Sequence, residues 1–159
     1  MPPPLFVDLS TINLEKPVLD RAGIAKILPH RDQLALIDSI LLADLVGEIG
    51  IGRMDVPKEA FWTSGHFPGN PILPGVVLVE ASAQVALVLY KMGTPEIADR
   101  LVVFGGIENV RFRGVVRPGD RVLLLLKMLD RSRRGARAAA QAVVNGKLVY
   151  EGEILAIVT

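Results

Sequence analysis

The chain has 159 residues, of which 50% are hydrophobic and 22% are charged, and its formal net charge is +1. This length favours a single domain with a substantial core, and the hydrophobic content excludes a disordered chain. The small net charge gives no indication of nucleic acid or an acidic membrane as a partner, and the absence of cysteine excludes disulfides, thiolate metal sites and cysteine nucleophiles.

Residues 1–19 are predicted to form an N-terminal arm and residues 20–159 a single domain. The arm holds four prolines, shows no sustained periodicity and lacks the features of a signal peptide. The longest apolar run, 76–90, contains Glu80 and Gln84 and is shorter than the ~20 residues of a spanning helix. We therefore expect a soluble, cytoplasmic protein with no membrane span.

The first half of the domain reads as a short helix, two strands, a loop and one long helix. Asp20 is the expected N-cap of the short helix, which Pro29 ends. The long helix is predicted over 75–91, because this segment is apolar and is followed by a glycine stop and a proline. The two strands are expected over 34–45 and 47–56, and the loop over 57–74.

The second half of the domain reads as four strands, over 101–113, 120–131, 136–145 and 147–158. Asn145-Gly146 predicts a two-residue hairpin, and the turn at 117–120 has proline and glycine where a reversal needs them. One long helix among six strands indicates an α+β chain. Since the helix is apolar on every side, we expect a curved antiparallel sheet wrapped around it, and an uncovered edge that favours a dimer.

The loop and the start of the long helix carry the candidate chemistry. Histidine side chains in general change charge near neutral pH and suit proton transfer, which makes His66 a candidate base, while burial favours the neutral form of Glu80. A base and an acid of this kind suit elimination or hydration beside a carbonyl. The free N–H groups at Gly75, where the helix begins, are donors for that carbonyl, and Gln84 lies one turn beyond Glu80, where it can orient the acid.

These residues alone leave a second interpretation open. A single histidine in a loop is commonly structural, and a buried glutamate in a helix is commonly paired with a neighbour. His30, in the segment Leu28-Pro29-His30-Arg31, is expected to be structural or to line an interface. The helix positions Leu78, Val85 and Leu89 are candidates to line an acyl tunnel, although core packing explains them equally well.

The segment GHFPGNPILPGVVLVEASAQ, which begins at Gly65, resembles the signature of the β-hydroxyacyl-acyl carrier protein dehydratases of the hotdog fold. Two further segments are similar to the same family in order and spacing. They are the segment ILPHR at 27–31 and the segment FGGIENVRF at 104–112, followed by RPGD. The resemblance covers residues 21–158.

The resemblance implies that His66 removes a C2 proton from a (3R)-hydroxyacyl thioester and that Glu80 protonates the departing hydroxyl. Gly75, Gln84 and Phe67 are then expected to bind the substrate. It also implies an acyl carrier protein as partner, a homodimer whose sites take His and Glu from different protomers, and assembly as a trimer of dimers. No metal or organic cofactor is implied, and Glu at position 80 instead of Asp favours plain dehydration.

Four arginines surround a predicted turn between the fourth and fifth strands: Arg131, Arg133, Arg134 and Arg137. These arginines either belong to a solvated hairpin tip or form a docking site (the predicted dock) for the acidic surface of a carrier protein. Two other functions stay open for the whole chain. One is a hydratase or dehydratase acting on another acyl thioester, such as an acyl-CoA, and the other is a hotdog protein that only binds acyl chains.

Overall fold

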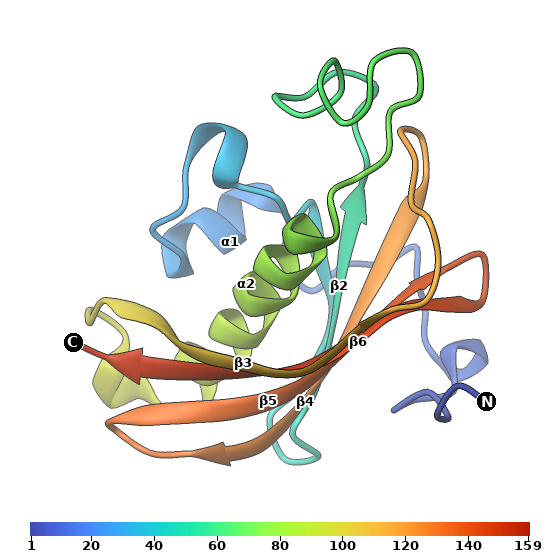
Figure 1. The fold of residues 1–159 in the computed structure, drawn as a ribbon. Coiled ribbons are helices and arrows are strands. Elements are labelled where there is room, and N and C mark those ends of the chain that lie inside the picture. Colours follow the sequence, from blue (N-terminus) through green and yellow to red (C-terminus); the bar gives the residue numbers. More distant parts are fainter.

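A computed structural model describes residues 1–159 as six strands, two α-helices and three short 3-10 segments (Figure 1). The helices are α1 (Arg21–Ile27) and α2 (Gly75–Gly93), and the 3-10 segments are Leu9–Thr11, Asp32–Leu34 and Pro95–Ile97. The strands are β1 (Ser39–Asp44), β2 (Ile49–Asp55), β3 (Val102–Phe112), β4 (Arg121–Arg131), β5 (Gly135–Val144) and β6 (Lys147–Val158). Every pairing is antiparallel, which confirms the predicted α+β sheet with one long helix.

Turn chemistry sets most of the element boundaries. Asn145 and Gly146 both have positive φ, 49° and 77°, as the tight hairpin between β5 and β6 requires. The side chain of Asp44 accepts hydrogen bonds from the N–H groups of Val46 and Gly47, which closes the turn after β1. The first strand begins at residue 39 instead of the predicted 34, because residues 32–34 form a 3-10 turn.

The sheet has the strand order β1-β2-β4-β5-β6-β3 and curves around α2, as Figure 1 shows. Of the 19 residues of α2, 13 are buried, so the helix is a core helix despite having the length and apolarity of a membrane-spanning one. Gly50 and Gly52 of β2 let the helix approach closely. A Cβ at Gly52 would lie 2.3 Å from Val85 Cγ2, and one at Gly50 would lie 2.1 Å from Leu89 Cδ1.

The N-terminal arm covers the face of the sheet that points away from α2 (Figure 1). Along β4, Leu124 belongs to the core around the helix, whereas Leu123 and Leu125 point to the opposite face, as strand alternation dictates. Apolar residues of the arm pack on this second face: Leu5, Phe6, Val7, Leu9, Ile12 and Leu14. Gln141 fastens the arm, because its side chain accepts from the N–H of Phe6 and donates to the carbonyl of Pro4, both at 2.9 Å.

The two edges of the sheet differ. At the β1 edge, Val18 and Leu19 donate to the carbonyl of Ile40, so part of that edge is covered by the chain itself. At the other edge lies β3, a strand of 11 residues that pairs only with β6. This strand also exposes large apolar side chains, namely Val103, Phe104, Ile107 and Phe112. A long apolar edge of this kind is a surface that proteins normally cover.

The close approach of α2 to β2 predicts a specific sensitivity. Gly52→Ala should lower the free energy of unfolding by about 1–3 kcal/mol, because the new methyl group overlaps Val85 between two packed elements. Gly65→Ala is the matched control, since no atom lies within 4 Å of a Cβ at that position, and it should change the free energy by no more than about 1 kcal/mol. Urea unfolding of both variants measures these changes in the free energy of unfolding. An equal loss of stability in the two variants would contradict the packing of α2 against β2.

Candidate active site

Glu80 lies in the second turn of α2, and its side chain is 27% exposed. One turn further on, Gln84 donates from Nε2 to Glu80 Oε1 at 2.9 Å. The same amide donates to the carbonyl of Leu34 at 2.7 Å and accepts from the N–H of Leu36 at 3.2 Å. Gln84 therefore holds the carboxyl group in place and fastens the 34–36 segment to the helix.

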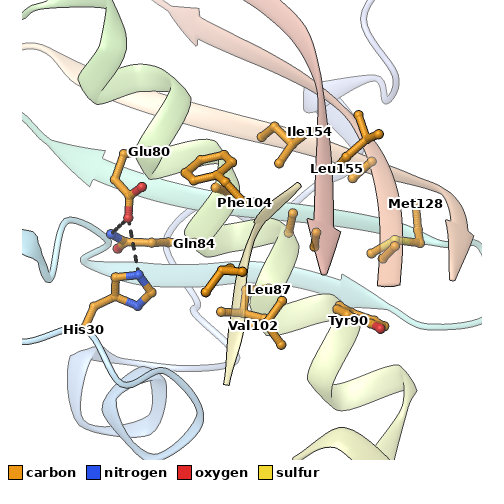
Figure 2. A pocket seen from close by; sticks show the side chains of 16 residues that line it. His30, Glu80, Gln84, Leu87, Tyr90, Val102, Phe104, Met128, Ile154 and Leu155 are labelled. Atoms are coloured by element: carbon orange, nitrogen blue, oxygen red, sulfur yellow. Dashed lines mark hydrogen bonds and ion pairs between the residues drawn. The ribbon is translucent and has the colours of Figure 1, made fainter. Parts of the chain in front are cut away.

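His30 reaches the same carboxyl group from the segment that follows α1. Its Nε2 lies 3.3 Å from Glu80 Oε1, as Figure 2 shows, and its Nδ1 is buried with no hydrogen-bond partner. The sequence-based expectation was that His30 is structural or lines an interface, and its contact with Glu80 was not predicted. The only sequence signal was the conspicuous Leu28-Pro29-His30-Arg31 segment, which does not say what the imidazole touches.

The environment of Glu80 corrects one expectation. Burial raises the pKa of Glu80, but the His30 imidazole and the Gln84 amide outweigh burial, and the pKa lies below its ordinary value. The prediction that burial keeps this acid neutral is therefore wrong for the single chain. The carboxyl group is ionised near neutral pH.

An apolar cavity of about 270 Å³ extends from Glu80 along one side of α2 (Figure 2). Of its 16 lining residues, 13 are hydrophobic, and they come from α2 and from β3, β4, β5 and β6. Glu80 and His30 stand at one end, and Tyr90 and Met128 at the other. Ten residues of helix separate Glu80 from Tyr90, which corresponds to about 15 Å.

The helix face that lines this cavity is not the one proposed from the sequence. Ala83, Leu87 and Tyr90 line it, whereas Leu78, Val85 and Leu89 are buried in the core. Val85 and Leu89 pack against the glycines of β2. Since α2 is apolar on all sides, its hydrophobic pattern does not distinguish the two faces.

His66 lies in the 57–74 loop, which precedes α2. Its Nδ1 lies 2.7 Å from the carbonyl of Ile72, and the N–H of Ile72 donates back to the carbonyl of His66 at 2.8 Å. Because a carbonyl only accepts, Nδ1 carries the proton of the neutral ring and Nε2 is left as an acceptor. The ring of Phe67, which is half-exposed, stacks on the imidazole with centroids 4.1 Å apart.

Gly75 begins α2, where its N–H has no acceptor in the chain. A side chain is excluded at this position, because a Cβ would lie 2.6 Å from Cε1 of Phe112. The N–H therefore sits at the positive end of the helix with no side chain of its own beside it.

The structure brings Glu80, Gln84 and His30 together but not Glu80 and His66. His66 does not line the cavity that holds Glu80, and no contact joins the two side chains. Within one chain the candidate base and the candidate acid are therefore separate.

The four arginines of the predicted dock lie around the β4–β5 hairpin, and one of them, Arg131, lies beside Gly93 at the far end of α2. Three of them contact carboxylates of the same chain. Arg131 pairs with Glu48 at 2.8 Å, Arg133 lies 3.4 Å from Glu96, and Arg137 contacts Glu108 and Glu153. Arg134 has no ion pair.

Known proteins resemble this chain over most of its length. The sequence model of the FabA-like domain matches residues 28–153. The 3-hydroxyacyl-acyl-carrier-protein dehydratase FabZ of Moorella thermoacetica is 39% identical over 137 residues, which are 86% of this chain and 94% of that protein. The FabZ protein of Syntrophobacter fumaroxidans is 40% identical over 140 residues, 88% of this chain and 94% of that protein.

A solved structure supports the fold alone. The dehydratase heterocomplex ApeI:P from Xenorhabdus doucetiae matches with a TM-score of 0.71 at 17% identity, over 86% of this chain and 90% of that one. Its low identity carries no argument about residues. The family match and the FabZ relatives show the family, because they cover most of each sequence. The chain therefore belongs to the FabA-like domain family and, within it, to the FabZ-like dehydratases of the hotdog fold.

Proposed function

We propose that this protein is a (3R)-3-hydroxyacyl-acyl carrier protein dehydratase, which removes water to give the trans-2-enoyl thioester in fatty acid synthesis. The observation that carries this proposal is one carboxyl group, that of Glu80, at the end of an otherwise apolar cavity. An acyl chain fits such a cavity, and the reacting carbons near its thioester end then lie beside the carboxyl group. The FabZ relatives support the same reaction.

Each step of the elimination has a candidate group. Nε2 of His66, free because Nδ1 is engaged with Ile72, accepts the C2 proton. Glu80 delivers a proton to the departing C3 hydroxyl, and Gln84 keeps the carboxyl group oriented. The unpaired N–H of Gly75 donates to the thioester oxygen as negative charge develops on it.

A complete site requires a second chain in this proposal, because His66 and Glu80 lie apart within one chain. The apolar edge strand β3 is where the second copy would pair, and a β3–β3 contact would join two sheets into one and cover Phe104 and Ile107. This supports a homodimer, and the family resemblance extends it to a trimer of dimers. We infer a cytoplasmic enzyme with acyl carrier protein as its partner.

Removal of either catalytic group should abolish turnover. His66→Ala and Glu80→Gln should each lower kcat for 3-hydroxyacyl thioesters by about 10²–10⁴, the usual contribution of a general base or acid. The rate is followed from the absorbance of the enoyl product, with substrates on acyl carrier protein and on CoA. Asp99→Asn, which neutralises an exposed acid outside the site, is the matched control and should leave kcat unchanged.

The results separate the alternatives. Undiminished activity in either variant would overturn the assigned roles. Turnover confined to CoA substrates would indicate the acyl-CoA enzyme. No turnover of any thioester by the wild type would indicate a protein that only binds acyl chains.

The arginine hairpin is tested separately as the carrier dock. Arg133 and Arg134 are the members least tied to carboxylates, so replacing both by Gln should raise KM for carrier-bound substrate several-fold, up to about tenfold. KM for a short thioester mimic should stay constant. Lys16→Gln with Lys147→Gln removes the same charge elsewhere on the surface and serves as control. An equal change of KM for both substrates would count against docking at this hairpin.

A further inference from the structure

Glu80 presents a difficulty to any mechanism that uses it as an acid. The acid must hold a proton at the moment the hydroxyl leaves, yet its contacts with His30 and Gln84 favour the ionised carboxylate. Both partners approach the same oxygen, Oε1, and Oε2 has no partner in the chain. One oxygen is thus held by the protein and the other is available to a substrate.

His30 is the only titratable side chain that contacts this carboxyl group. Its Nε2 lies 3.3 Å from Oε1, and both side chains are largely shielded, with 24% and 27% of their area exposed. Imidazoles hold a proton to higher pH than carboxyl groups do. A proton on the imidazole is therefore one short transfer away from the carboxyl group.

We propose that His30 is a positioning residue for Glu80, and that the two side chains hold in common the proton that leaves with the substrate hydroxyl. The proposal rests on the dehydration proposed above. His66 takes the C2 proton, the C3–O bond breaks, and Glu80 gives a proton to the departing oxygen, which forms water. The proton moves from Nε2 of His30 to Glu80 in the same process. His66 then releases the C2 proton to solvent and the pair regains one, so the enzyme starts the next turnover with the protons it began with.

The surroundings of His30 leave Glu80 as the only carboxylate in contact with it. From α1, Arg21 faces the small cleft beside the imidazole and pairs with Asp38. Arg31 lines the same cleft and donates to the carbonyls of Ala25, Leu28 and His30.

The remaining neighbours add little charge. Asp32, which lines that cleft, has no ion pair. On the cavity side the strands contribute only apolar residues, and Tyr90 lies at the far end. Glu80 is thus the one acidic group to which His30 can pass a proton directly.

Replacement of His30 by glutamine separates the two roles. The amide Nε2 of Gln can still donate to Oε1, but it cannot store a proton. In His30→Gln the carboxyl group alone must hold the proton, so the alkaline limb of the kcat profile for dehydration should move to lower pH by about one unit or more. At pH 8 kcat should fall about tenfold or more, while KM stays within about twofold.

A purely structural role gives a different result. In that case His30→Gln should have a higher kcat than His30→Ala, or His30→Gln and His30→Ala should lower kcat equally at every pH. An alkaline limb at the wild-type position in His30→Gln overturns the proposal.

A measurement without turnover tests the pair independently of the proposed reaction. The carboxyl ¹³C resonance of Glu80, assigned by its loss in Glu80→Gln, should titrate in two steps in the wild type, the second in the imidazole range. In His30→Gln it should titrate in one step, at higher pH than the main wild-type step, because the charge that lowers the pKa of Glu80 is gone. Identical titrations in the two proteins would overturn the pairing, whether or not the enzyme acts on a hydroxyacyl thioester.

Discussion

The structure depends on the need to cover a helix that is apolar on every side. Between Gly75 and Tyr90 the only charged side chain of α2 is Glu80, so nearly the whole helix must be removed from water. The sheet achieves this by curving around α2, with Gly50 and Gly52 admitting the helix on one side. On another side the strands do not pack closely against α2, which leaves a cavity, and Glu80 lies at one end of this cavity. The same packing thus produces both the core and the candidate site.

Much of this fold is predictable from the sequence because local chemistry sets it. The Asn145-Gly146 turn, the glycine that ends α2 with the proline that follows, and the alternation along the strands each act over a few residues. The acid in the apolar helix is equally visible. The contact of His30 with Glu80 is not, because it joins positions 50 residues apart and depends on how the segment after α1 folds back. The cavity-lining face of α2 is likewise set by tertiary packing, which a uniformly apolar pattern does not encode.

The separation of His66 from Glu80 has a physical consequence. Each chain supplies a candidate base, His66, with a free Nε2 on its 57–74 loop and a carboxyl group in a cavity, but it does not bring them together. The apolar edge strand β3 is a surface that a second copy can cover. Association would then remove exposed apolar area and complete two sites at once, so that stability and activity depend on the same contact.

The central claim is that one active site takes His66 and Glu80 from two chains. The most direct test mixes His66→Ala and Glu80→Gln proteins, each inactive alone, under conditions that exchange subunits, with heterodimers verified by native mass spectrometry. Random pairing of equal amounts makes half of the dimers mixed, and each mixed dimer holds one intact site, so about a quarter of wild-type activity should return. No recovery of activity in a sample with verified heterodimers would contradict the shared site.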